Sequence, residues 1–235
     1  NMAISGETID YGPCAFMDTY NPKTVFSSID YHGRYAYFNQ PSITKWNLER
    51  FAESLIPLID NNEDKAIEMA TEVIHSFAEK YKKNWFEMMR KKLGLLGEDS
   101  KDESLIIDLL SWMHQNKADY TNTFCFLMNK NIQENKIYNN QGFIGWKQQW
   151  QERLKLHYNS PEESLKLMRL ANPLVIPRNH KVEEALNAAA TDNDLIQIHN
   201  LLKVLKNPYK NSPEIANYQS SPPPSNKIYR TYCGT

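Results

Sequence analysis

The sequence predicts a mainly α-helical protein that opens with a short β-hairpin and ends in an extended tail. From Trp46 onward, apolar residues recur at helical spacing with charged residues between them. Glycine is scarce, at 8 of 235 residues, and this favours helices over a β-sandwich. Prolines gather after Asn207, and the run Pro222-Pro223-Pro224 is typical of extended backbone.

The composition argues against several classes of protein. Lys and Arg number 27 and Asp and Glu number 28, for a net charge of −1, so no strong field attracts nucleic acid or a membrane surface. No apolar run reaches the length of a membrane-spanning helix. Three widely spaced cysteines suit neither a disulfide scaffold nor a zinc ribbon, which favours a reducing compartment. We therefore expect neither a nucleic-acid nor a membrane partner.

The opening stretch NMAISGETIDYG predicts the hairpin. With Ser5-Gly6 as a two-residue turn, Asn1 faces Asp10 across the ribbon, and directly opposed residues lie about 5 Å apart. An amide oxygen beside a carboxylate is a ligand pair that suits magnesium, with nucleotide phosphates supplying further oxygens. A turn centred one residue away would change this register, so the pairing is a hypothesis.

The rest of the chain predicts helices joined by short breaks. Gly94 and Gly97 are expected to close the second helix, Pro57 to end or kink the first, and Pro161 to begin the sixth after Ser160. The expected helices span residues 46–58, 61–92, 104–116, 119–129, 143–156, 161–170, 182–190 and 194–205.

Aromatic and histidine residues in these helices are interpreted as ordinary helix and packing residues. No Lys or Arg cluster accompanies the tryptophans, so packing explains them better than a stacking platform for nucleic acid does. The histidines show no metal-ligand spacing, and Cys125 is expected in the core. The residues concerned are Trp46, Trp85, Trp112, Trp146, Trp150, His75, His114, His157 and His199.

Longer motifs point to a family. Asp10-Tyr11-Gly12 is similar to the Asp-Phe-Gly of protein kinases, whose Asp holds magnesium, although such a triplet alone is more often a simple turn. Together with TIDYGPCAFMD, the stretches GRYAYFNQPSITKWNLERFAESLIPLI and NPLVIPRNHKVEEAL and the end Tyr-Cys-Gly-Thr resemble the selenoprotein O family. The family's members are YdiU-like, kinase-fold pseudokinases that act as protein adenylyltransferases.

The resemblance, which runs from residue 1 to 235, implies a fold and a division of the chain. The expected fold is a protein-kinase-like C-terminal lobe. Residues 1–45 would hold the metal-binding hairpin and an activation-segment-like region, residues 46–206 a helical lobe, and residues 207–235 an extended tail that carries Cys233.

The implied reaction is the transfer of AMP from ATP to Ser, Thr or Tyr hydroxyls of proteins, with Mg (or Mn). Asn1 and Asp10 would hold the metal, so that Asp10 reaches the ATP phosphates through it. The catalytic base, an Asp, is expected just before Asn1. Family members are roughly twice this length, so an upstream half of the same protein is an expected partner, and this fragment alone is expected to be inactive. The location expected is cytoplasmic in a bacterium and mitochondrial in a eukaryote.

Two cysteines carry a redox expectation from the same resemblance. Some bacterial members form a regulatory disulfide between the terminal Cys, here Cys233, and a position that aligns with Phe26. Cys14 is the nearest substitute, provided that the Cα atoms come within about 7 Å. The alternative is two unrelated thiols.

Two basic segments admit both a structural and a functional interpretation. Gly33 is expected to serve a turn and Arg34 to pair with a carboxylate; the alternative places Arg34 or His32 near the acceptor substrate. Arg178 is expected to lock two helices by hydrogen-bonding carbonyl groups, with Asn179 or His180 capping the next helix. A catalytic role for Arg178 is the less favoured alternative.

Two other functions stay open. A conventional protein kinase would transfer the γ-phosphate rather than AMP, and a non-catalytic helical binding fragment would transfer neither. An Asp immediately before Asn1 and a glycine-rich loop further upstream would favour an enzyme.

Overall fold

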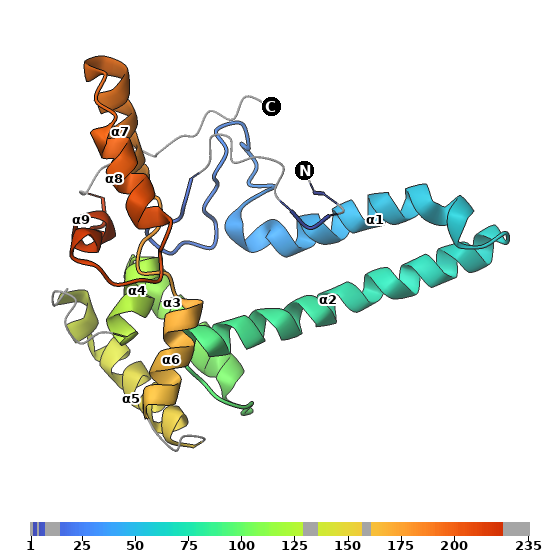
Figure 1. Ribbon diagram of the computed structural model, residues 1–235. Helices are drawn as coiled ribbons and strands as arrows, with labels where there is room; N and C mark the ends of the chain where they lie inside the picture. Colours follow the sequence, from blue (N-terminus) through green and yellow to red (C-terminus); the bar gives the residue numbers. More distant parts are fainter. Residues whose placement is uncertain (1, 4, 8–14, 129–135, 157–160, 223–235) are drawn as a thin grey trace. The chain divides into compact units, whose positions relative to one another are not determined.

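The computed structural model describes residues 2–3, 5–7, 15–128, 136–156 and 161–222, and it is mainly helical, as predicted (Figure 1). The chain divides into two compact units. The first comprises Asn1–Cys14, Pro22–Glu87 and Arg230–Thr235, and the second comprises Ala15–Asn21 and Met88–Tyr229.

The predicted opening hairpin is wrong. The described residues contain no strand; an isolated bridge pairs Thr19 with Asp119 in the second unit. The Gly6 N–H donates to the Ala3 carbonyl at 3.1 Å, and Gly6 has a φ of +71°. This hydrogen bond closes a turn between Ala3 and Gly6, one position before the expected turn. Asn1 and Asp10, which the hairpin was expected to pair, lie outside the described part.

The first unit is built on two long helices. A short 3-10 helix, η1 (Tyr37–Asn39), leads into α1 (Gln40–Ile59), and α2 (Glu63–Leu93) follows, its last residues belonging to the second unit. A Pro in the first turn explains why α1 begins before Trp46, since its fixed φ suits a helix start. The helix also continues past Pro57, which removes only one hydrogen bond of its last turn.

The turn before η1 explains the Gly33 and Arg34 segment. The Asp30 carboxylate accepts the backbone N–H groups of Arg34 and Tyr35, each at 2.8 Å, and Gly33 has a φ of +66°. The predicted turn is confirmed. The Arg34 guanidinium lies 4.7 Å from the centroid of the Trp46 ring, so its contact is an aromatic face rather than the expected carboxylate.

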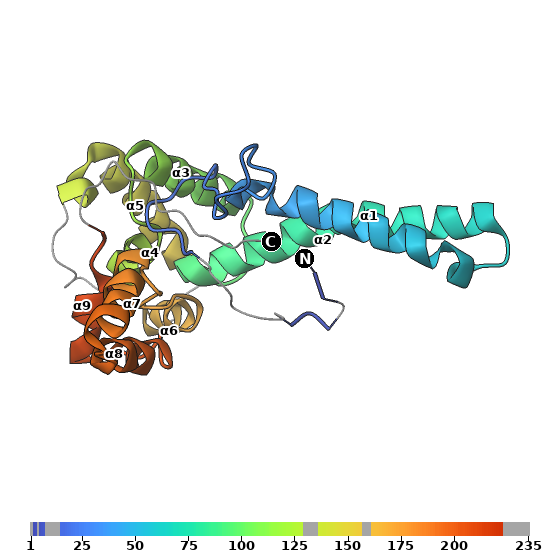
Figure 2. The same ribbon diagram turned by 90° about the horizontal axis from the view of Figure 1, so that it is seen from above.

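The second unit contains the remaining helices. Within it, α7 and α8 run side by side as a helical hairpin (Figure 1, Figure 2). The elements are α3 (Asp102–Gln115), α4 (Tyr120–Met128), η2 (Lys136–Asn139), α5 (Gln141–Lys155), α6 (Pro161–Ala171), α7 (Asn179–Asp192), α8 (Ile196–Leu205), η3 (Pro213–Ile215) and α9 (Ala216–Gln219).

Gly94 ends α2, as predicted. Its φ is +67°, and a Cβ at this position would collide with Ser164 and Met168 of α6. The residue thus serves both the reversal of the chain and the close approach of α6.

An aromatic cluster forms much of the core of the second unit. Trp112, Trp146 and Trp150 are buried, and the Trp146 and Trp150 rings stack with centroids 6.0 Å apart. Their indole N–H groups donate to the Leu105 and Leu93 carbonyls at 2.8 and 2.9 Å. The packing interpretation is therefore confirmed for these tryptophans.

The start of the tail differs from the expected extended backbone. Residues 213–219 form η3 and α9, and the Gln219 amide donates to the Leu174 carbonyl at 2.9 Å. The Leu174 N–H in turn donates to the Pro208 carbonyl at 2.7 Å, so this part packs back onto the second unit. Across the described ranges, no helix combines the length and apolar character that crossing a bilayer requires.

Candidate functional site

The residues predicted to hold a metal or to form a disulfide lie outside the described part of the chain. These are Asn1, Asp10, Cys14 and Cys233. Within the described ranges, no three His, Cys, Asp or Glu side chains gather as a metal site would require. The metal site and the redox pair stay predictions. Cys125 is fully buried, which confirms its predicted place in the core.

Residues 15–21, which follow the Asp-Tyr-Gly motif, are anchored in the second unit by backbone contacts. The Tyr20 N–H donates to the Ala118 carbonyl, and the Tyr120 N–H donates to the Asp18 carbonyl, each at 2.8 Å. The Asn179 amide donates to the Phe16 carbonyl at 3.2 Å, and its oxygen accepts the Phe16 N–H at 3.4 Å. Asn179 therefore fastens this segment and does not cap α7, contrary to expectation.

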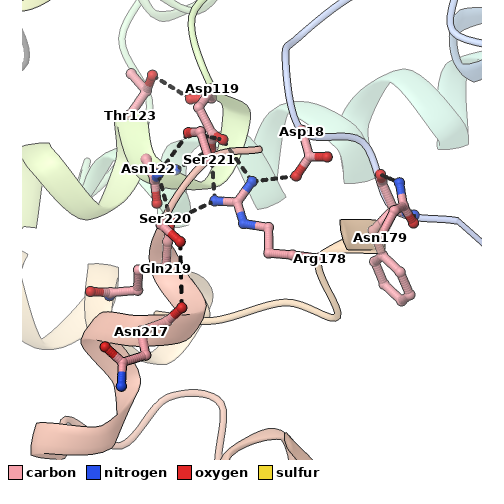
Figure 3. Close-up of polar contacts among 11 residues, drawn as sticks. Asp18, Asp119, Asn122, Thr123, Arg178, Asn179, Asn217, Gln219, Ser220 and Ser221 are labelled. Atoms are coloured by element: carbon pink, nitrogen blue, oxygen red, sulfur yellow. Dashed lines mark hydrogen bonds and ion pairs between the residues drawn. The ribbon is translucent and has the colours of Figure 1, made fainter. Parts of the chain in front are cut away.

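Arg178 lies at the centre of this anchor (Figure 3). It is 1% exposed and is among the largest fully buried side chains of the described residues. Its Nη1 donates to Asp18 at 2.5 Å and to Asp119 at 2.6 Å, and its Nη2 donates to the second Asp119 oxygen at 3.1 Å. Nη2 also reaches the Gln219 carbonyl at 3.3 Å. We call Arg178, Asp18 and Asp119 the Arg178 centre.

The Asp119 carboxylate has further donors around it. It accepts the backbone N–H of Asn122 at 2.8 Å, at the start of α4, and the Ser221 hydroxyl at 2.9 Å. The Asn122 amide donates to the Gln219 carbonyl at 2.9 Å. The centre thus joins residues 15–21, the start of α4, the start of α7 and the end of α9.

Electrostatics hold the guanidinium charged. Burial works to lower the pKa of Arg178, but the hydrogen bonds and charges of Asp119 and then Asp18 raise it above its ordinary value. The Arg178 Nε and the neighbouring His180 Nδ1 are buried without a hydrogen-bond partner. Burial lowers the pKa of His180, and the charge of Lys181 lowers it further.

This geometry favours the structural interpretation of Arg178. Both Nη atoms are already engaged by carboxylates and a carbonyl, and the side chain is buried, so it does not present a free fork to a substrate. The expectation of carbonyl partners was incomplete, because the main partners are carboxylates. No sequence signal indicated them, since Asp18 and Asp119 lie in unrelated segments.

A second buried arginine has a simpler environment. Arg153 of α5 donates from Nε to Asp102 at 2.7 Å and from Nη2 to the other Asp102 oxygen at 3.2 Å. It also reaches the Leu96 and Gly97 carbonyls at 3.2 and 3.4 Å. Asp102 is 1% and Arg153 5% exposed. We call Arg153 and Asp102 the Arg153 centre; it fastens the loop between α2 and α3 to α5.

Lys92 is a buried cation of another kind, which sequence reasoning missed. Its Nζ lies 4.5 Å from the Phe124 ring centroid and 5.4 Å from that of Tyr120. Burial lowers its pKa to about 8, and burial likewise raises the pKa of nearby Cys125 to about 12. The lysine lies among other lysines near the end of α2, where solvated positions are the usual expectation.

Comparisons with known proteins agree with the motifs. The sequence model of the family described as protein adenylyltransferase SelO matches residues 1–206. The chain is 57% identical over all 235 residues to a protein nucleotidyltransferase YdiU of Pelagibacter ubique and 53% identical to one of Halalkalibacterium halodurans, covering 48% of each. A YdiU protein of Nitrosococcus oceani is 50% identical, with the same coverage. The chain thus spans about half the length of the curated relatives it matches.

Proposed function

The chain belongs to the protein adenylyltransferase SelO family, and from this premise we propose that the complete protein transfers AMP from ATP to a hydroxyl group of a protein Ser, Thr or Tyr. The observation that carries the proposal is the family match over residues 1–206, supported by relatives that are named nucleotidyltransferases over the whole chain.

In the proposed reaction, the acceptor oxygen bonds to the α-phosphorus of ATP while the bond from that phosphorus to the leaving pyrophosphate breaks. The hydroxyl proton would pass to the Asp that we expect just before Asn1. Such a transfer depends on in-line positioning and on neutralising the phosphate charge.

Asn1 and Asp10 are proposed to hold a magnesium ion against the phosphates. Amide and carboxylate oxygens are the donors that this ion prefers, and the ion would supply charge neutralisation.

The test uses the longer polypeptide, with ATP labelled at either the α- or the γ-phosphate. We expect protein hydroxyls to acquire the α-label and Asp10→Asn to abolish the labelling. Asp108→Asn is the matched control, because Asp108 is an exposed carboxylate of α3 in the second unit.

Each other outcome has a defined meaning. Transfer of the γ-label would favour a conventional kinase, and transfer of neither label would favour a non-catalytic binding fragment. Labelling retained in Asp10→Asn would contradict the metal role of Asp10.

A further inference from the structure

The first unit leaves an unusual amount of apolar side chain exposed on α1 and α2. All residues of α1 are described and none is buried, although Trp46, Phe51 and Leu58 are 44%, 42% and 80% exposed. Within residues 63–87 of α2, Ala66 is the one buried residue. A long amphipathic helix is normally stabilised by burying its apolar face, so these two helices lack a covering surface.

The two helices diverge from the turn at residues 60–62 (Figure 1), and residues of both helices line a groove. Its volume is about 920 Å³. The apolar part of its lining consists of Ala52, Ile56, Pro57, Ile67, Ala70 and Ile74. Ile67, at the α2 wall, is 46% exposed.

The charges at the groove favour an apolar occupant. Its lining among the described residues includes four carboxylates and a single guanidinium, which belong to Glu49, Glu53, Asp60, Glu63 and Arg50. Glu53 pairs with Arg50 at 2.7 Å and Asp60 with Lys65 at 2.5 Å, so the rim is largely satisfied within the unit. A phosphate-bearing ligand would face these carboxylates, whereas an apolar segment would bury the isoleucines and disturb no ion pair.

The curated relatives indicate where such a segment comes from. This chain covers 48% of each of the relatives described above, so about as much sequence again belongs to those proteins and is not matched here. We call it the complementary half. A surface on the same polypeptide is present at a high effective concentration and needs little intrinsic affinity to dock.

We propose that an apolar segment of the complementary half docks in the α1–α2 groove and covers its exposed isoleucines. A second copy of this chain fits less well, because a two-fold dimer places the same surface against itself. Two grooves facing each other would leave the isoleucines of each groove uncovered. The proposal rests on family membership and not on the transfer reaction, so it stands or fails separately from the proposed function.

Photo-cross-linking in the longer polypeptide tests the occupant directly. A photoreactive amino acid replaces Ile67, and the cross-linked peptides are mapped by mass spectrometry. Cross-links to the complementary half are expected. Cross-links to another copy, cross-links only to residues 1–235, or a failure to cross-link would overturn the proposal.

A matched pair of variants tests the energetics in the same polypeptide. Ile67 and Ile107 are both 46% exposed, but Ile107 lies on α3 in the second unit. We expect Ile67→Glu to lower the thermal midpoint by roughly 5 °C and Ile107→Glu to change it little, because a charge is disruptive only where the side chain becomes buried. Equal shifts, or a larger shift for Ile107→Glu, would overturn the proposal.

Discussion

The two buried arginines of the second unit use the same chemistry for different tasks. Arg153 meets one carboxylate, Asp102, through a two-point contact and fastens a nearby loop. Arg178 divides its donors between Asp18 and Asp119, which are 160 and 59 positions away in the chain. A buried ion pair can therefore close a loop locally or join segments that no local signal connects.

The largest expected effect is that of Arg178→Met. Removing the guanidinium leaves two partly buried carboxylates without their cation, and breaking a buried pair in this way costs about 3–5 kcal/mol. Urea unfolding monitored by circular dichroism measures the loss. A loss below 1 kcal/mol would show that the Arg178 centre does not join the segments around it.

Arg153→Met is the matched variant for the first prediction. It orphans one carboxylate instead of two, so we expect a loss of about 3 kcal/mol, smaller than that of Arg178→Met. Hydrogen exchange adds a local readout. Exchange should accelerate at residues 96–102 in Arg153→Met and at residues 16–20 in Arg178→Met. Acceleration of both regions in both variants would remove the distinction between the two centres.

Lys92 differs from the two buried arginines because it contacts the faces of aromatic rings rather than carboxylates. Its pKa falls from 10.5 to about 8 on burial, so between these pH values the unfolded chain binds more protons and stability rises with pH. The full effect is about 3 kcal/mol, at about 1.4 kcal/mol per pKa unit. Below pH 8 the stability of the folded chain does not gain from this effect, and above pH 10.5 the gain is complete.

Burial raises the pKa of Cys125 and Tyr138 to about 12, which opposes this gain above pH 9. The measurement is therefore the difference in unfolding free energy between the wild-type chain and Lys92→Met, followed from pH 7 to pH 10.5. We expect the unfolding free energy of the wild-type chain to rise relative to that of the variant as pH rises. A constant difference would mean that Lys92 keeps an ordinary pKa.

Among the variants of buried groups, Asp18→Asn is expected to have the smallest effect. Asp18 retains 16% side-chain exposure and makes one contact with Arg178. A hydrogen bond to a charged group contributes about 1.5–3 kcal/mol, and the neutral oxygen of Asn keeps part of it, so we expect a loss of about 1–2 kcal/mol. Asp108→Asn, on an exposed face, should stay within about 0.5 kcal/mol of the wild-type chain. Equal unfolding free energies for the two variants would show that Asp119 alone holds Arg178.

Local patterns predicted the helices well because their causes are local. Apolar spacing located the helices of the second unit, and Gly94 marked the end of α2 because a left-handed residue suits that position. The family motifs identified the chain's relatives for the same reason, since a motif is contiguous sequence. The prediction of the opening hairpin failed because a turn at residues 3–6 and one at residues 4–7 differ by a single position. The pattern of side chains alone does not distinguish these two turns.

Sequence alone was enough to predict the helical character of the chain, the ends of several helices, the lack of a strong charge bias and the family. These follow from neighbouring residues and composition. The contacts of Arg178 with Asp18 and Asp119, the burial of Lys92 against the Phe124 ring and the exposure of α1 became visible only in the folded chain. Each of these depends on which distant segments meet, and the free energy of a buried charge or an exposed apolar face is set by the neighbours that the fold supplies.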